Sequence, residues 1–372
     1  MMENNVADYR RALHKIPELD RELPETRTFV ESVLSRLSCE VFSPAEGAVC
    51  AFFDAGKSDA VAFRADMDAL PVTENTGLAY SSEHAGKMHA CGHDGHMAML
   101  LSLAEYIDEN KDGLPHNVLL VFQPAEETTG GAKPICDSGV FKKYNVLRIF
   151  GFHIWPNLPE GRVYTRSGAM MARSSEITVR IKGRSVHISR YAEGADALFA
   201  GAEFLRRVYD MERSEIPEDE ERLLRFGRMV SGTVRNALSD STELKGSMRA
   251  FSFETFHYMK RRCEEIAAEV AGKTGCAFDI DLSEGYPPVI NDKRLYIEVM
   301  TYLAALGAQT PAVLAAPVMA AEDFSCYQQS LPGLFFFIGA GSSGELHSPG
   351  FSFDDEILKN GVSFYEKLLN ME

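Results

Sequence analysis

Residues 117–127 read NVLLVFQPAEE, an apolar run that ends in Gln-Pro-Ala and a pair of glutamates. A short apolar run that stops at turn residues is typical of a strand buried on both faces. Similar runs occur at 60–66 (AVAFRAD), 146–154 (VLRIFGFHI) and 333–341 (GLFFFIGAG), and helical patterns such as GHMAMLLSLAEYIDEN (95–110) separate them. Strands that alternate with helices predict an α/β fold around a mixed, largely buried sheet.

The middle of the chain has a different pattern. Strand-like and helix-like segments follow in the order βαββαβ, at 174–183, 195–211, 227–234, 241–251, 254–275 and 276–283. This order is the split-βαβ pattern of ferredoxin-like domains. We therefore expect an α/β domain formed by residues 1–173 and 285–372, with a ferredoxin-like domain inserted at 174–284.

Composition narrows the classes of function. The chain has 372 residues, 45% of them hydrophobic, which is enough for two cored domains. Its formal net charge of -16 disfavours nucleic acid and anionic membrane surfaces as partners. No stretch approaches the roughly 20 apolar residues of a membrane span. The seven cysteines are scattered, which suits a reducing compartment, so we expect a cytoplasmic protein.

Residues that commonly bind metals recur beside the predicted strand ends or, in MHACGHDGHM (88–97), just before a predicted helix. Open α/β sheets place their active sites beyond the carboxyl ends of the strands, so these side chains are expected to share one site. They are Asp66, Asp68, Cys91, His93, Glu126, Glu127, His153 and His347. Cys91 and His93, two apart in extended backbone, should point the same way.

The mixed thiol, imidazole and carboxylate set suits Zn²⁺, and also Mn²⁺, Co²⁺ or Ni²⁺. The chain lacks a CxxC pair, which disfavours a closed structural zinc site. Five ligands shared between two ions would leave open positions, as catalytic sites require. Adjacent residues of extended backbone face opposite ways, so one of Glu126 and Glu127 could bind metal while the other accepts a proton.

Six stretches together resemble the aminoacylase-like family of dimetal metallopeptidases and amidohydrolases. The resemblance is to its branch of hippurate hydrolases, indole-acetyl-amino-acid hydrolases and N-acetyldiaminopimelate deacetylases. The stretches are FRADMDALP (63–71), MHACGHDGHM (88–97), FQPAEETTGGAKP (122–134), FGFHIWPNLPEG (150–161), AAEDF (320–324) and ELHSPGF (345–351). The resemblance covers nearly the whole chain and implies a metal-binding catalytic domain with an inserted lid through which the protein forms a homodimer.

The resemblance also implies roles for individual residues. Two divalent metal ions per chain, Zn²⁺ or Mn²⁺ before Co²⁺ or Ni²⁺, would be held by Cys91, His93, Glu127, His153 and His347, with Cys91 as a bridging thiolate. Glu126 matches the general base. Asp66 matches an aspartate that orients a histidine ligand, and Asp94 is a second candidate for such work.

Three residues of the lid resemble groups that contact the substrate. His187 matches a histidine that reaches the partner subunit's site and holds the developing oxyanion. Asn236 and Arg249 resemble residues that contact the substrate carboxylate or oxyanion. The stretch GRSVHISRYA (183–192) departs from the family's usual GGHAA.PH: Ser185 and Val186 precede His187, and Tyr191-Ala192 stands in place of Pro-His.

These features predict a metal-dependent amidohydrolase that cleaves an N-acyl amino acid, such as N-acetyldiaminopimelate or a hippurate-like substrate. One alternative is a cysteine hydrolase in which His93 activates Cys91. Another is a paralogue that binds metal and an acyl-amino acid without turnover, because of the altered stretch around His187.

Other polar residues have simpler interpretations. His89 and His96 are expected to support the ligands or to lie on the helix surface, and His14 to lie on the protein surface. Glu322 and Asp323 lie near the metal site in the family, but either could be an acidic residue at a helix start with no chemical role.

Overall fold

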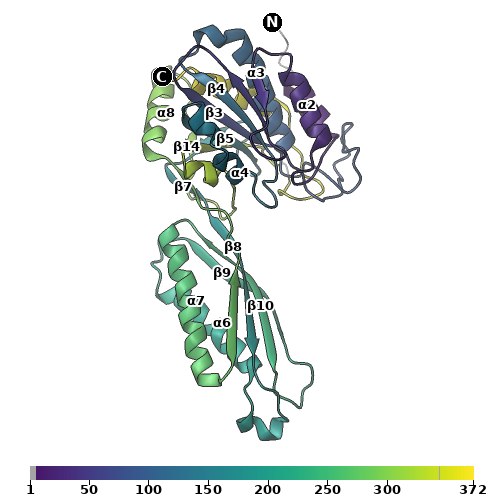
Figure 1. Cartoon of the computed structure of the whole chain (residues 1–372), viewed down its shortest axis with the longest axis vertical. Coiled ribbons are helices and arrows are strands. Elements are labelled where there is room, and N and C mark those ends of the chain that lie inside the picture. The colour runs from purple at the N-terminus through teal and green to yellow at the C-terminus, as the bar shows by residue number, and fades with distance from the viewer. Residues whose placement is uncertain (1–5, 343) are drawn as a thin grey trace. The chain divides into compact units, whose positions relative to one another are not determined.

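The structure is a computed structural model that describes residues 6–342 and 344–372. The chain separates into two compact units, each shown in Figure 1. The first unit comprises Met1–Met170, Ile290–Ala316 and Asp323–Glu372, and the second comprises Met171–Val289 and Pro317–Glu322. The inserted domain predicted at 174–284 falls inside Met171–Val289. The short segment Pro317–Glu322, which also belongs to the second unit, was not predicted.

The first unit is built on a mixed sheet with the strand order β1-β2-β4-β3-β5-β14-β6-β13. At its centre, β4, β3, β5 and β14 are parallel to one another, while β2 and β6 run antiparallel to β4 and β14. The strands are β1 (Glu40–Phe42), β2 (Val49–Phe53), β3 (Ala60–Asp66), β4 (Asn117–Gln123), β5 (Val146–Trp155), β6 (Val163–Thr165), β13 (Ala312–Val313) and β14 (Gly333–Gly339).

Both faces of this sheet are covered, as the continuous apolar runs predict. Phe335 and Phe336 are consecutive residues of β14 and therefore point to opposite faces. The Phe336 ring lies 5.0 Å from Phe364 on one face, and the Phe335 ring lies 4.8 Å from Phe324 on the other. The helices of this unit are α1 (Val6–His14), α2 (Pro24–Leu34), α3 (His93–Asn110), α4 (Ala132–Asp137), α5 (Val140–Lys143), α8 (Lys293–Ala305), α9 (Ser325–Gln328) and α10 (Glu356–Leu369), with a 3-10 turn at Lys111–Gly113.

Two glycines let the start of α3 approach the end of β5. Gly92 precedes the helix with a φ of 84°, a conformation that favours glycine. A Cβ on Gly95 would lie 2.6 Å from Ile154 Cδ1 and 2.9 Å from Phe353 Cζ. Because these two residues have no side chain, the start of α3 approaches β5 closely and the Cys91–His93 segment lies beside His153.

The second unit is an antiparallel sheet with the order β11-β8-β10-β9, packed against α6 and α7 (Figure 1). Its chain order is βαββαβ, so the predicted ferredoxin-like pattern is confirmed. The elements are β8 (Arg173–Lys182), a 3-10 helix at Ile188–Glu193, α6 (Ala197–Ser214), β9 (Arg222–Ser231), β10 (Ser241–Ala250), α7 (Phe253–Thr274) and β11 (Ala277–Leu282).

The α/β class is likewise confirmed, with small differences. Strand β9 starts five residues before the predicted 227, because an edge strand does not need the apolar alternation that reveals a buried strand. The short strands β7 (Gly168–Met171) and β12 (Val289–Asn291) pair with each other and were not predicted. Among the described helices, none combines the length and the apolar character needed to cross a bilayer.

Replacement of Phe336 by alanine should destabilise the first unit by about 3–5 kcal/mol, because its ring is completely buried between the sheet and α10. Ile297→Ala, on the exposed side of α8, is the control and should change stability by about 0.5 kcal/mol or less. Urea unfolding followed by circular dichroism measures both, and equal midpoints for the two variants would contradict this packing.

Candidate metal centre

Three neighbouring parallel strands end at one edge of the first sheet and carry polar side chains there. β3 ends at Asp66, β4 is followed by Glu126 and Glu127, and His153 lies near the end of β5. Parallel neighbours bring their carboxyl ends to the same edge, which is where α/β proteins place their sites. The predicted convergence of these segments is therefore present.

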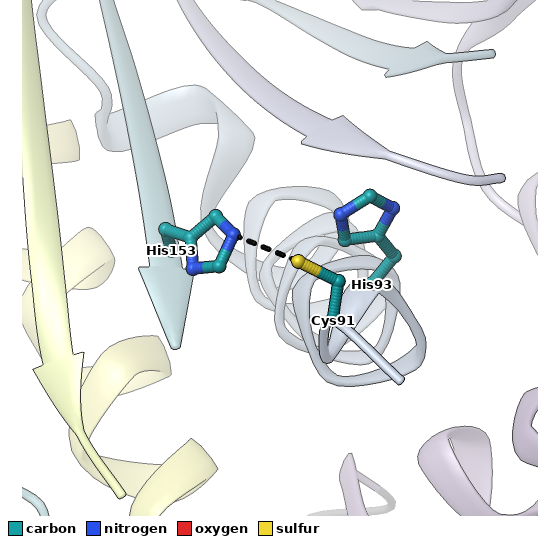
Figure 2. A group of neighbouring side chains, drawn as sticks. All are labelled: Cys91, His93 and His153. Carbon is teal, nitrogen blue, oxygen red and sulfur yellow. Dashed lines mark hydrogen bonds between the residues drawn. The ribbon is translucent and has the colours of Figure 1, made fainter. Parts of the chain in front are cut away.

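The structure brings the five predicted ligands together in overlapping groups. Ligand atoms within 4.8 Å of one another belong to Cys91, His93 and His153 in one group and to Cys91, Glu127 and His347 in a second. Figure 2 shows the first group, in which Cys91 Sγ lies 3.4 Å from His153 Nε2. Cys91 belongs to both groups, as a thiolate shared between two ions would require.

The local backbone differs from the extended segment that the sequence suggested around Cys91. The left-handed Gly92 turns the chain, and α3 begins at His93 itself. His347 comes from a loop that is distant in the sequence, and it also has a positive φ, of 62°. The N–H of His347 donates to the carbonyl oxygen of Ala90 at 2.8 Å, so a backbone hydrogen bond fastens this loop to the Cys91 segment.

The two glutamates do not face opposite ways as expected. Ala125 has a φ of 59°, and the chain turns rather than extends at Glu126 and Glu127. Carboxylate oxygens of both glutamates consequently lie within 4.8 Å of a His93 ring nitrogen. Asp68 holds this turn, since its two carboxylate oxygens accept the N–H groups of Glu126 (2.9 Å) and Glu127 (3.0 Å).

The ligand histidines are oriented through their Nδ1 atoms. His93 Nδ1 donates to the carbonyl oxygen of Asp68 at 2.7 Å, and His153 Nδ1 donates to the carbonyl oxygen of Ile154 at 2.6 Å. The buried His93 Nε2 has no hydrogen-bond partner among the described residues. A buried imidazole with Nδ1 occupied and Nε2 unpaired is prepared to bind a cation, so the residues present fit a divalent metal.

Asp66 lies behind this cluster, and its hydrogen-bond partner there is His96, which is not one of the five predicted ligands. Its Oδ1 is 2.5 Å from His96 Nδ1 but 3.8 Å from His93 Nδ1. His96 and His89 are 2% and 1% exposed, so neither lies on a helix surface. Asp68 was expected at the site because it follows Asp66 by two residues, but the sequence did not indicate its role.

Asp94 is also buried, and α1 supplies its partners. His14 Nδ1 lies 2.8 Å and Arg10 Nε 3.2 Å from Asp94 Oδ2. The expectation that His14 is a surface residue was wrong, because residues four apart on α1 share a face and that face packs on α3.

The electrostatics of Cys91 argue against an unaided cysteine nucleophile. Burial raises the pKa of the Cys91 thiol well above its usual range, and the charges of Glu127 and Glu126 raise it further. Burial also lowers the pKa of His153, the ring beside the thiol, to about 3. Reactive cysteines need the opposite environment, whereas a bound cation would favour the thiolate.

The carboxylates respond to different neighbours. Burial acts to raise the pKa of Asp66, but His93, His96 and Arg64 hold this pKa well below its usual range. For Asp68, burial dominates and raises the pKa, with the charges of Glu127 and Asp66 adding to the effect. The site is therefore crowded with acidic groups that a divalent cation would stabilise in their charged forms.

The three predicted substrate-contacting residues lie in the second unit. His187 and Asn236 are exposed neighbours: the N–H of Ile188 donates to Asn236 O at 3.0 Å, and His187 forms an isolated bridge with Ala237. His187 also contacts Ser189 Oγ through its Nδ1, at 2.8 Å. Arg249 lies on β10, where its guanidinium donates to the carbonyl oxygen of Met319. Their roles toward a substrate stay predictions.

The chain is similar in sequence to known hydrolases. Residues 62–371 match the sequence profile of peptidase family M20/M25/M40. The IAA-amino acid hydrolase ILR1-like 4 of Arabidopsis thaliana is 34% identical over 369 residues, covering 96% of this chain and 83% of that protein. An uncharacterized hydrolase of Staphylococcus aureus is 32% identical over 375 residues, covering 98% and 97% of the two chains.

A solved structure shares the whole architecture. The YXEP protein of Bacillus subtilis, described as a dinuclear metal binding peptidase of the M20 family, aligns with a TM-score of 0.85 at 28% identity and covers 98% of this chain and 96% of its own. The profile match and the relatives above 30% identity together show that this chain belongs to peptidase family M20/M25/M40. The predicted family resemblance is confirmed, and the chain is accordingly a hydrolase with a candidate metal centre.

Replacement of Asp68 by asparagine should destabilise the protein even without metal. Asparagine offers one carbonyl oxygen where Asp68 accepts two N–H groups, so a buried donor loses its partner at a cost of about 1–3 kcal/mol. Thermal unfolding of metal-free protein measures the effect, with the exposed Asp112→Asn as control. A Tm unchanged in Asp68→Asn would show that Asp68 does not hold the Glu126–Glu127 turn.

Proposed function

We propose that this protein is a dimetal amidohydrolase that cleaves N-acyl amino acids to a carboxylate and a free amino acid, with Glu126 as general base. The observation that carries the proposal is that carboxylate oxygens of Glu126 and Glu127 lie within 4.8 Å of each other and of a His93 ring nitrogen, in a turn whose two N–H groups donate to Asp68. A general base must lie within reach of the water that it deprotonates, and this turn supports that position for Glu126.

Cys91, His93, Glu127, His153 and His347 would hold two divalent ions, for which Zn²⁺ and Mn²⁺ suit the mixed donors better than Mg²⁺ or Ca²⁺. When bound, such ions lower the pKa of water and polarise the amide carbonyl. Glu126 would take the proton of the attacking water and later deliver it to the leaving amine, which departs as the free amino acid. Asp66 supports the site through the histidine that it contacts.

The substrate class and the partner belong to the same proposal. The Arabidopsis relative is named for hydrolysis of an amino-acid conjugate, which favours an N-acyl amino acid over a long peptide. His187, Asn236 and Arg249 would contact the substrate carboxylate or oxyanion, with His187 acting on the site of a partner subunit in a homodimer formed through the second unit. All seven cysteines are thiols rather than disulfides, which suits a cytoplasmic enzyme.

The adjacent glutamates provide a matched pair of variants. Metal-reconstituted Glu126→Gln should lose about 10²–10⁴-fold in kcat toward the best of a panel of N-acetyl and N-benzoyl amino acids, because the proton acceptor is gone. It should still bind two ions. Glu127→Gln should bind less metal, because a ligand carboxylate is replaced. Amine release and metal content by mass spectrometry measure the two effects.

Each contrary outcome has a distinct meaning. Full turnover by Glu126→Gln would contradict the general-base role. Chelator-resistant turnover that needs Cys91 would favour the cysteine hydrolase. Two bound ions with no turnover of any substrate in the panel would favour the paralogue that binds without turnover. The altered residues around His187 are the reason for considering that alternative.

Mixing two inactive variants tests the role of His187 across a dimer. His187→Ala alone should lower kcat about 10²–10³-fold, as loss of one oxyanion donor does elsewhere. If His187 serves the partner's site, co-expression with Glu126→Gln yields heterodimers with one intact site, and about a quarter of wild-type kcat per total site should return. Failure of the mixed protein to exceed either parent would contradict action across subunits.

A further inference from the structure

His96 lies one turn after His93 on α3, and both of its ring nitrogens are engaged. Nε2 accepts the backbone N–H of Ile154 at 2.8 Å, and an N–H group can only donate. Nε2 is therefore unprotonated, and Nδ1 carries the proton that it donates to Asp66 Oδ1 at 2.5 Å. Although Asp66, His93 and His96 form a group compact enough for a metal ion, the His96 ring has no lone pair left for one.

Ile154, whose N–H donates to His96, also forms a hydrogen bond with the predicted metal ligand His153. The carbonyl oxygen of Ile154 accepts from His153 Nδ1 at 2.6 Å, and this orientation directs His153 Nε2 toward Cys91 Sγ. The pairing of β5 with β3 ends at Gly151, so the N–H of Ile154 lies beyond the last β3 partner. His96 supplies the acceptor that a neighbouring strand would otherwise provide.

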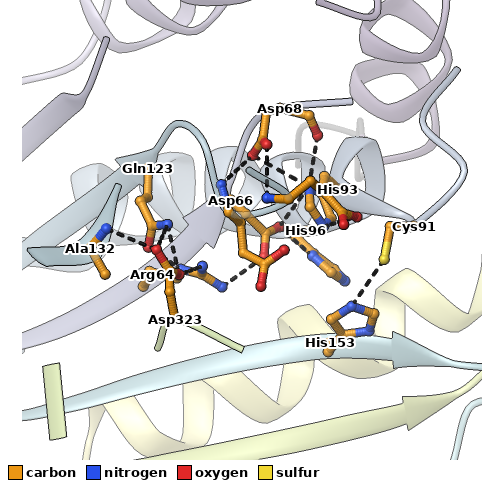
Figure 3. Close-up of polar contacts among 12 residues, drawn as sticks. Arg64, Asp66, Asp68, Cys91, His93, His96, Gln123, Ala132, His153 and Asp323 are labelled. Atoms are coloured by element: carbon orange, nitrogen blue, oxygen red, sulfur yellow. Dashed lines mark hydrogen bonds and ion pairs between the residues drawn. The ribbon is translucent and has the colours of Figure 1, made fainter. Parts of the chain in front are cut away.

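Asp66, the partner of His96, is held from behind by a buried cation. Arg64 Nη1 donates to Asp66 Oδ2 at 2.7 Å, and Arg64 Nη2 donates to Asp323 Oδ1 at 2.9 Å. All three side chains have 0% exposure. Asp323 also accepts the N–H of Ala132 at 3.0 Å, which anchors it to the start of α4 (Figure 3).

We infer that His96 is a positioning residue for the metal centre and that Asp323, through Arg64 and Asp66, is the outer end of the same relay. The relay runs from Asp323 to Arg64, Asp66, His96 and the Ile154 peptide, and it sets the direction of the His153 ring at Cys91. The inference rests on the proposed function only in taking His153 and Cys91 as metal ligands. Asp323 then has a supporting role rather than that of a helix-start acid.

The substitutions His96→Asn and His96→Gln each keep one of the two hydrogen bonds of His96 and remove the other. Asparagine places an amide near Nδ1 and can still donate to Asp66, whereas glutamine places a carbonyl near Nε2 and can still accept from Ile154. Asp323→Asn changes the far end of the relay with almost no change in shape and serves if the His96 variants fold poorly. Thr165→Val is the matched control, because it removes a buried hydrogen bond to the carbonyl oxygen of Phe335 that involves no residue of the relay.

The full-length protein is loaded with Co²⁺, and affinity is measured by calorimetry while visible and near-ultraviolet spectra report the thiolate and imidazole ligands. Loss of a group that orients a ligand lowers metal affinity about 10–100-fold, and we expect this loss for one ion in both His96 variants and in Asp323→Asn. The Co²⁺ spectrum should change with it. Thr165→Val should keep the wild-type affinity and spectrum, even if its Tm falls.

Two results would overturn the inference. One is unchanged affinity and spectrum in both His96 variants. The other is three ions bound to the wild type and two to His96→Asn, which would make His96 a ligand of a third metal. Because binding and spectra need no turnover, a protein that hydrolyses no amide would refute the proposed function and leave this test valid.

Discussion

The buried guanidinium of Arg64 organises the edge of the sheet at which the candidate site lies. It is completely excluded from solvent and is paired with Asp66 and Asp323, while its Nε donates to Gln123 Oε1 at 2.8 Å. These partners come from the ends of β3 and β4 and from the segment before α9. A buried cation that loses one charged partner costs about 3–5 kcal/mol, so the three segments are strongly constrained to end together.

At the front of the site, by contrast, several acidic groups lie close together. Burial and neighbouring carboxylates raise the pKa of the Cys91 thiol and of Asp68, whereas Glu127 remains below its usual pKa because His347 and His93 oppose the effect of burial. Acidic groups that crowd one another in a buried place are costly unless a cation joins them. The protein supplies Arg64 behind Asp66, and divalent ions would supply the charge in front.

Sequence reasoning located the parts of this site that depend on residue type and strand ends. The candidate ligands from Cys91 to His347 and both fold classes followed from apolar periodicity, from polar residues beyond strands and from the family signatures. Contacts between segments were beyond it. The orientation of His96 depends on where β3 stops alongside β5, and the shared direction of Glu126 and Glu127 depends on the positive φ of Ala125. His14 is buried only because α1 packs on α3, which no local pattern reveals.

The central proposal is that Cys91, which belongs to two groups of candidate ligands, would be shared between two divalent ions. Anomalous diffraction from crystals of the Zn²⁺-loaded protein tests it most directly. We expect two anomalous peaks, each about 2.3 Å from Cys91 Sγ, one beside His153 and the other beside His347. A single peak, or peaks that leave the Cys91 sulfur without a metal neighbour, would contradict it.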